Sequence, residues 1–169
     1  MAKLNREALM SYLDAGMHSK VADVASADWD IIGDDITDMS VELNSEVEQT
    51  KNILGQTRTV DNGYTPSMDA DPFYADPEKA FYEKIRDIAL ERQTGDTCKT
   101  LLLEVLVEDT SSSTHKAYVR EVLIKPQSYG GDATYVNIPF NVSEDGAFVK
   151  GTVTAASVKA GKPVFTAAS

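Results

Sequence analysis

The hydrophobic pattern predicts one clear helix, over residues 77–94. Its apolar side chains recur at helical spacing and form a single stripe: Phe81, Ile85, Ile88 and Ala89. Asp76 is a suitable N-cap, Pro77 fits the first helical position because no N–H is needed there, and Gly95 is a typical stop. An apolar stripe must be covered, so we predict that Phe81, Ile85 and Ile88 form a helix core packed on a sheet.

Strand-like patterns occupy most of the remaining chain. Residues 100–108 are apolar at nearly every position, which predicts a central strand buried on both faces. In residues 118–125 the alternation breaks at Arg120 and Glu121, which predicts a β-bulge or a partly solvated face. Alternating or short apolar runs predict further strands at residues 36–44, 135–142, 147–154 and 164–166, with a turn at residues 144–146.

The first 30 residues show no strong period. Residues 3–15 fit a short helix ending at Gly16, and Trp29 is expected in the core. We therefore predict an N-terminal arm over residues 1–30, ordered by contact with a neighbour, and a single β-sandwich domain over residues 31–169. The predicted fold class is mainly β with one packed α-helix, in a sandwich or barrel-like arrangement.

A long polar segment lies between the strand at residues 36–44 and the helix. Residues 46–60 are strand-like but polar, and Asp61-Asn62-Gly63 carries the Asn-Gly pair typical of hairpin turns. We expect a projecting hairpin or long loop over about residues 45–70. Exposed polar strands often pair with another chain, so we predict subunit contacts there. The predicted contact residues are Glu46, Glu48, Thr50, Asn52, Leu54, Thr57, Thr59 and Tyr64.

Composition narrows the possible partners. The 169-residue chain has a formal charge of −11, which argues against binding nucleic acid by neutralising phosphates. Cys98 is the single cysteine, so neither an internal disulfide nor a cysteine-based zinc site is expected. The N-terminus leads into no apolar signal region and no long apolar run follows, so we expect no membrane partner and synthesis in a cytoplasm.

Candidate catalytic residues are few. His115 follows a run of three serines, Ser111, Ser112 and Ser113, and a serine with a histidine base could form a hydrolase site. No glycine-framed nucleophile elbow surrounds these serines. A solvated loop is therefore the simpler interpretation. Acidic residues gather around Asp28–Asp35 and Asp69–Asp76 without the spacing of a calcium loop. We predict no enzyme activity, cofactor or metal. A monomeric glycan-binding β-sandwich remains an alternative class.

Several stretches together resemble the major tail proteins of long-tailed bacteriophages and related prophages. They are IIGDDITDM (residues 31–39), the segment 44–59, NGYTPSMDADPFYADPEKAFYEKIRDIA (residues 62–89), KPQSYGGDATYVNIPFNV (residues 125–142) and GTVT (residues 151–154). The resemblance rests on the order of these elements along the chain. A first strand is followed by a long polar hairpin, a Y-x-P leading into an acidic segment, one helix and a late hairpin. Residues 17–30 match less well.

This resemblance implies a virion protein that assembles in the host cytoplasm into hexameric rings stacked into a tail tube. It implies a sheet that joins neighbouring copies into a barrel lining the lumen, through which double-stranded DNA passes without specific binding. The implied partners are further copies of the chain, a tape-measure protein, a tail terminator and distal tail or baseplate proteins. The inner tube of a contractile tail or tail-like bacteriocin is a variant of this function.

Overall fold

The computed structural model describes residues 2–168 and is mainly β, as the sequence predicts. The strands are β1 (Leu9–Asp14), β2 (Trp29–Ile32), β3 (Val41–Glu42), β4 (Val47–Lys51), β5 (Thr57–Asp61), β6 (Ser67–Ala70), β7 (Lys99–Leu106), β8 (Thr114–Pro126), β9 (Phe140–Thr154) and β10 (Phe165–Ala167). The helices are α1 (Ala80–Glu91) and α2 (Ala155–Lys159), with 3-10 turns η1 (Arg6–Ala8), η2 (Val21–Ser26) and η3 (Gly95–Cys98). The short helix α2 was not anticipated from the sequence.

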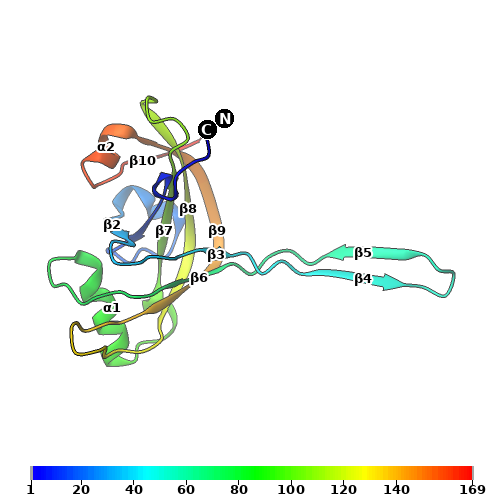
Figure 1. Cartoon of the computed structure of the whole chain (residues 1–169), viewed down its shortest axis with the longest axis horizontal. Coiled ribbons are helices and arrows are strands. Elements are labelled where there is room, and N and C mark those ends of the chain that lie inside the picture. Colours follow the sequence, from blue (N-terminus) through cyan, green and yellow to red (C-terminus); the bar gives the residue numbers. More distant parts are fainter. Residues whose placement is uncertain (1, 169) are drawn as a thin grey trace.

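Eight of these strands form one curled antiparallel sheet (Figure 1). Its order is β2-β1-β7-β8-β9-β6-β3, and β10 pairs with another part of β9. The strands β4 and β5 pair only with each other and leave the body of the molecule as a long ribbon. The chain therefore has two parts, which we call the body and the hairpin (residues 46–62).

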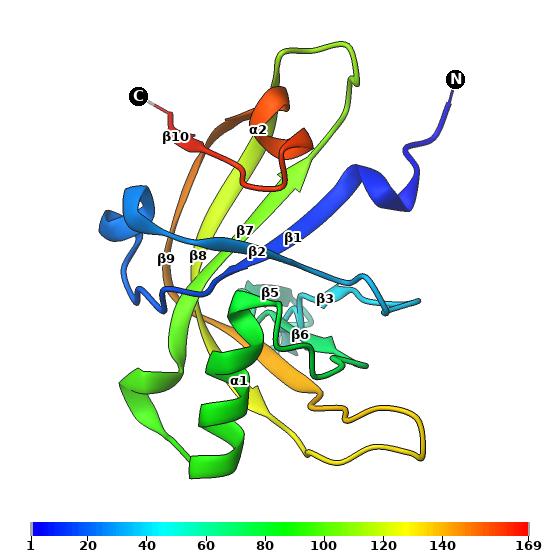
Figure 2. The same ribbon diagram turned by 90° about the vertical axis from the view of Figure 1, so that its left-hand side faces the viewer.

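Strand β7 is central and is buried on both faces, as predicted. Leu101, Leu103 and Val105 enter one core, whereas Leu102 enters the other. Since neighbouring residues of a strand point to opposite faces, the two cores lie on the two sides of the sheet. Figure 2 shows helix α1 lying against one part of the sheet, in which β1 runs antiparallel between β7 and β2.

Helix α1 buries the predicted stripe. Phe81 and Ile85 are 0% exposed and pack with residues of β8 and β9, and Ile88 is 3% exposed, which confirms that this stripe is buried. The helix is shorter than predicted at both ends. Asp76 instead caps the preceding turn by accepting from the Glu78 N–H at 3.0 Å, and the helix ends where Arg92 adopts a left-handed conformation (φ 54°).

The predicted N-terminal helix and arm are wrong. Leu9–Asp14 is strand β1, hydrogen-bonded between β2 and β7, so the predicted arm contributes β1 and the start of β2 to the sheet. Tyr12 and Leu13 are adjacent and both buried, one in each core, so this strand has no single apolar face for a sequence pattern to reveal. Trp29 lies in the core as predicted.

The predicted turn at residues 144–146 is also wrong, because β9 runs through it. The register of β8 on β9 shifts between Arg120 and Val122, which confirms the bulge. The buried Glu121 carboxylate accepts from the N–H groups of Val21 (2.9 Å) and Ala147 (3.3 Å). Gly146 (φ 138°) permits this approach, since a Cβ there would lie 2.5 Å from Glu121 Oε1.

Two predicted strands are shorter than expected. Of residues 36–44, Val41–Glu42 forms a strand, and Leu43 is exposed. Of residues 135–142, the part from Phe140 onward belongs to β9. Val136 is 54% exposed, whereas Ile138 is buried. Both segments supply apolar contacts to the body without a full ladder of hydrogen bonds.

Candidate assembly interface

The hairpin extends away from the body and has no hydrophobic core of its own. Every residue of β4 and β5 is exposed, and the antiparallel register runs from Val47 opposite Asp61 to Lys51 opposite Thr57. Figure 1 shows the ribbon clear of the body along its length. The projecting hairpin predicted from the sequence is therefore present, but its turn lies at residues 52–56 instead of at Asn62-Gly63.

Asn52 organises the tip of the hairpin. Its side-chain Oδ1 accepts from the N–H groups of Leu54 (2.9 Å) and Gln56 (3.0 Å), and its Nδ2 donates to Gln56 Oε1 at 2.9 Å. Gly55 adopts φ 78°, a conformation that side-chain-bearing residues rarely take. A compact hydrogen-bonded loop thus presents Ile53 and Leu54 to solvent.

The base of the hairpin is fixed to the body. Glu46 N–H donates to the Gly63 carbonyl at 3.0 Å, and Asn62 N–H donates to the Glu46 carbonyl at 2.7 Å. Asn44, itself at φ 49°, donates from Nδ2 to the carbonyl oxygens of Glu42 (3.3 Å) and Thr65 (2.9 Å). The Asn-Gly pair that predicted a hairpin turn therefore closes the base of the ribbon.

The predicted contact residues all lie on or beside the hairpin, but the strands do not bring them to one face. Residues opposite each other in the register share a face, so Glu48 and Thr50 lie on one side and Thr59 and Thr57 on the other. Glu46 and Asn52 flank β4, Leu54 is at the tip, and the exposed Tyr64 follows the base. The sequence prediction located the surface and missed how its faces divide.

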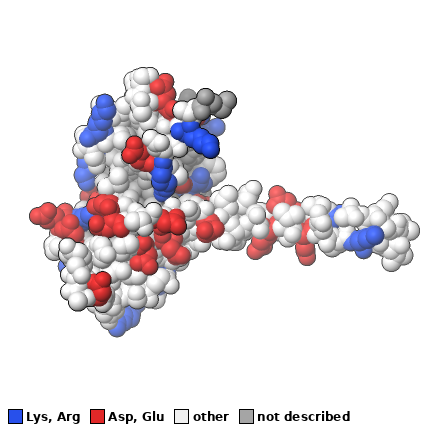
Figure 3. Space-filling view, viewed as in Figure 1, with Lys and Arg blue, Asp and Glu red and all other residues white. Residues whose placement is uncertain are grey.

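The tip differs from the rest of the hairpin in polarity and charge. Ile53 is 102% exposed and Leu54 is 76% exposed, and the adjoining strand ends carry the basic residues Lys51 and Arg58. Glu46, Glu48 and Asp61 lie towards the base. Figure 3 shows this division, with basic atoms near the far end and acidic atoms nearer the body. Ile53, Lys51 and Arg58 were not among the predicted contact residues.

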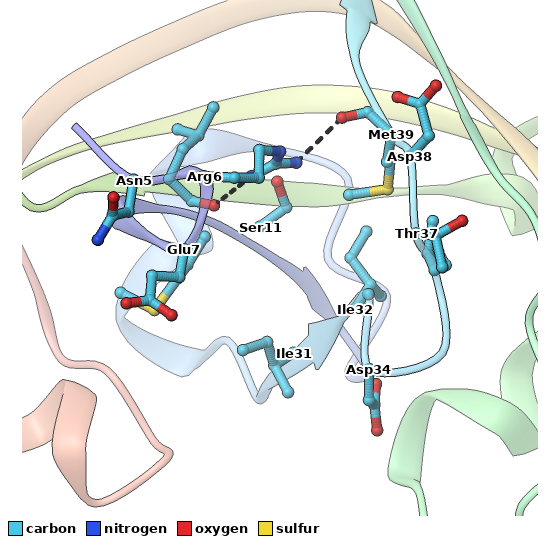
Figure 4. Close-up of a pocket in the computed structure, with 14 residues that line it drawn as sticks. Asn5, Arg6, Glu7, Ser11, Ile31, Ile32, Asp34, Thr37, Asp38 and Met39 are labelled. Atoms are coloured by element: carbon cyan, nitrogen blue, oxygen red, sulfur yellow. Dashed lines mark hydrogen bonds between the residues drawn. The ribbon is translucent and has the colours of Figure 1, made fainter. Parts of the chain in front are cut away.

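A groove of about 630 Å³ lies on the body, between residues 5–11 and residues 31–39. Apolar side chains line it, including Leu9, Ile31, Ile36 and Met39 (Figure 4). Arg6 spans its upper part by donating to the carbonyl oxygens of Leu9 (2.8 Å) and Met39 (3.0 Å). The groove adjoins β2, which lies at one end of the sheet order and pairs with β1 alone. No sequence pattern predicted it, because its two walls come from separate segments.

A charged cluster lies on the sheet where β7, β8 and β9 run together. Arg120 Nε is 2.7 Å from Glu104 Oε1 and 3.5 Å from Glu144 Oε1, and its guanidinium lies 5.0 Å from the centre of the Phe148 ring. Burial raises the pKa of Glu144, Arg120 opposes that rise, and the neighbouring Glu104 adds to it. Arg120 thus pairs with both carboxylates of the cluster.

The serine loop does not assemble a nucleophile with a base. Ser111 Oγ donates to Asp109 Oδ1 at 2.6 Å, and Ser112 Oγ donates to the Thr114 carbonyl at 2.8 Å. The Ser111 hydroxyl holds the pKa of Asp109 below its usual range. His115 is buried in β8, and within residues 2–168 no hydrogen bond joins it to these serines.

The acidic clusters bond to protein groups. Asp30 accepts from the Phe81 N–H at the start of α1 (3.0 Å), Asp28 pairs with Lys162 (2.9 Å), and Asp34 pairs with Lys79. Within the described part of the chain, no three His, Cys, Asp or Glu side chains are arranged to hold a metal ion. In the same residues, no helix has the length and apolar character needed to cross a bilayer.

Comparisons with known proteins add no further assignment. No protein family model matches the sequence, and no curated protein matches it.

Proposed function

We propose that this protein is a structural subunit of a bacteriophage tail tube, which assembles into hexameric rings that stack around the path of the DNA. The observation that carries the proposal is the hairpin: a long, ordered ribbon with both faces and both edges free. Unpaired strand edges bind other chains readily, and a protein that retains such a ribbon gains from a partner that covers it.

The fold supports the same proposal. The curled sheet with one packed helix is compatible with the tail-tube fold implied by the sequence resemblance. In the proposed ring, sheets of neighbouring copies join into a barrel around the lumen. Contact between different surfaces of identical copies closes into a ring when the rotation between them divides a full turn. The acidic chain would then repel DNA phosphates wherever it faces the lumen.

The partners follow from this function. They are further copies of the chain, a tape-measure protein inside the tube, a tail terminator at one end and distal tail or baseplate proteins at the other. The location is the virion tail, after assembly in the host cytoplasm. The same subunit could serve the inner tube of a contractile tail or tail-like bacteriocin.

Assembly of the purified protein tests the proposal. Negative-stain electron microscopy across a concentration series, with and without the tape-measure partner, should show rings or tubes. Sedimentation velocity should show species far larger than the 18.4 kDa monomer. A protein that stays monomeric under all these conditions contradicts the proposal, and saturable binding of that monomer on a glycan panel would favour a glycan-binding module instead.

A further inference from the structure

We propose that the tip of the hairpin, residues 51–58, docks into the apolar groove between residues 5–11 and 31–39 on a second copy of the chain. This inference rests on the proposed self-assembly and identifies the two surfaces that meet. It concerns a contact between copies, because the hairpin carries its tip away from the body that contains the groove (Figure 1).

The apolar part of the fit comes from Ile53 and Leu54. These neighbouring aliphatic side chains are exposed, at the end of a ribbon whose strands are mostly polar, with Val47 and Val60 as the apolar exceptions. Removing aliphatic side chains from water favours association, so a tip that presents two of them favours an apolar receptor. The groove is lined by side chains of the same character, with Leu9 and Ile31 each at least 40% exposed.

The electrostatic part of the fit comes from opposite charges. Residues 51–58 contain Lys51 and Arg58 and no acidic residue, although the whole chain carries −11. The groove wall contains Glu7 and Asp38, both exposed, and neither lies in an ion pair with any residue between 2 and 168. Arg6, the basic residue of the wall, is held by backbone carbonyl oxygens. A basic tip therefore meets an acidic rim.

The order of the tip favours docking without rearrangement. The hydrogen bonds of Asn52 hold the loop that presents Ile53 and Leu54, so the loop loses little conformational freedom when it binds. Tip and groove are different surfaces of one chain. Each copy can thus donate its tip to one neighbour and receive a tip from another, which propagates or closes an assembly.

A charge-reversal exchange tests the assignment. One variant carries Lys51→Glu and Arg58→Glu in the tip, and the other carries Glu7→Lys and Asp38→Lys in the groove. Each alone places like charges in the contact and should raise the concentration needed for assembly by about 10-fold or more in sedimentation velocity. An equimolar mixture should restore assembly, because each tip then meets a groove of opposite charge.

The control experiments distinguish the effect of charge at the contact from a change in overall charge or in folding. Glu78→Lys with Glu91→Lys makes the same change in net charge as the groove variant, on exposed positions just before and at the end of helix α1, and should assemble like the wild type. Thermal unfolding of all variants should be unchanged, since the reversed side chains are exposed. As a direct readout, Leu54→Cys protein mixed with Ile31→Cys protein should form a disulfide-linked dimer on oxidation, while the buried Cys98 stays reduced.

The outcomes distinguish the two proposals. A wild type that never assembles contradicts the proposed function. A wild type that forms rings or tubes, while both reversed variants assemble equally well, overturns the groove assignment and leaves the function standing. The groove assignment also fails if each reversed variant alone does not assemble, their mixture does not assemble either, and the two cysteine variants form no disulfide-linked dimer.

Discussion

The body and the hairpin are both antiparallel β-structure, yet different interactions stabilise them. Strand β7 buries nearly every side chain between two cores, whereas β4 and β5 expose all of theirs. An isolated two-stranded hairpin is at best marginally stable in water. The hairpin therefore depends on hydrogen bonds at its tip and base, while the body depends on apolar burial. Substitutions should thus affect folding in the body and association in the hairpin.

The largest expected effect is at Asp14, a buried carboxylate in the body. It accepts from the N–H groups of Gly16 (2.7 Å), His18 (3.0 Å) and Asp28 (2.9 Å). Asp14→Ala leaves these donors without their acceptor, so the free energy of unfolding should fall by about 3–5 kcal/mol in urea titration. Exposed Asp38→Ala is the control and should change it little; equal effects would refute the structural role of Asp14.

Core truncation gives the next largest effect and compares the two regions directly. Ile85→Ala removes a fully buried side chain of α1 and should lower the free energy of unfolding by about 2–5 kcal/mol. Ile53→Ala removes the same side-chain atoms from the exposed tip and should change it by less than about 0.5 kcal/mol. If both variants shift the urea midpoint alike, the division between body and hairpin is wrong.

Asn52→Ala should disorder the tip and leave the body intact. The substitution removes three side-chain hydrogen bonds, each with a net value of about 1 kcal/mol. We expect faster amide exchange at Leu54 and Gln56 and weaker assembly, with an unchanged thermal midpoint. The neighbouring exposed Thr50→Ala is the matched control. Unchanged exchange at the tip would show that Asn52 does not organise it.

The smallest expected effect is a pH dependence from Glu144. Because burial raises its pKa in the folded protein, the folded state binds this proton more tightly than the unfolded state. Its contribution to stability is therefore greatest below the ordinary pKa of 4.5 and declines as the pH rises through the raised value. Glu144→Gln should remove this decline in unfolding curves measured across that window; an identical pH profile would contradict the assignment.

Elements whose buried residues follow a regular pattern along the chain were predicted from the sequence. The helical stripe of α1 and the continuous apolar run of β7 are long and unambiguous, so both were located correctly. Strand β1 was missed because Tyr12 and Leu13 enter opposite cores and the polar Asp14 is itself buried. The burial of Asp14 depends on the folded chain, since its carboxylate accepts from N–H groups of the turn that follows it and from the N–H of Asp28.

The projecting hairpin was predicted in position more successfully than in detail. The polar composition of residues 46–60 identified the hairpin. For the turn, the adjacent Asn62-Gly63 pair is a stronger sequence signal than Asn52 and Gly55, which are separated by two residues. The turn was therefore placed at the base of the ribbon. No sequence pattern indicated the groove, because its two walls come from separate segments that meet only after the sheet has formed.

The segregation of charge along the chain also gives each molecule an electric dipole. Its positive end is the far end of the ribbon, and its negative end is the acidic body. Two approaching molecules in low salt lower their energy by aligning in series, because parallel neighbours would place like poles side by side. Physiological ions shorten the range of this torque to about 8 Å. In the proposed assembly, this torque would orient incoming copies before any two surfaces touch.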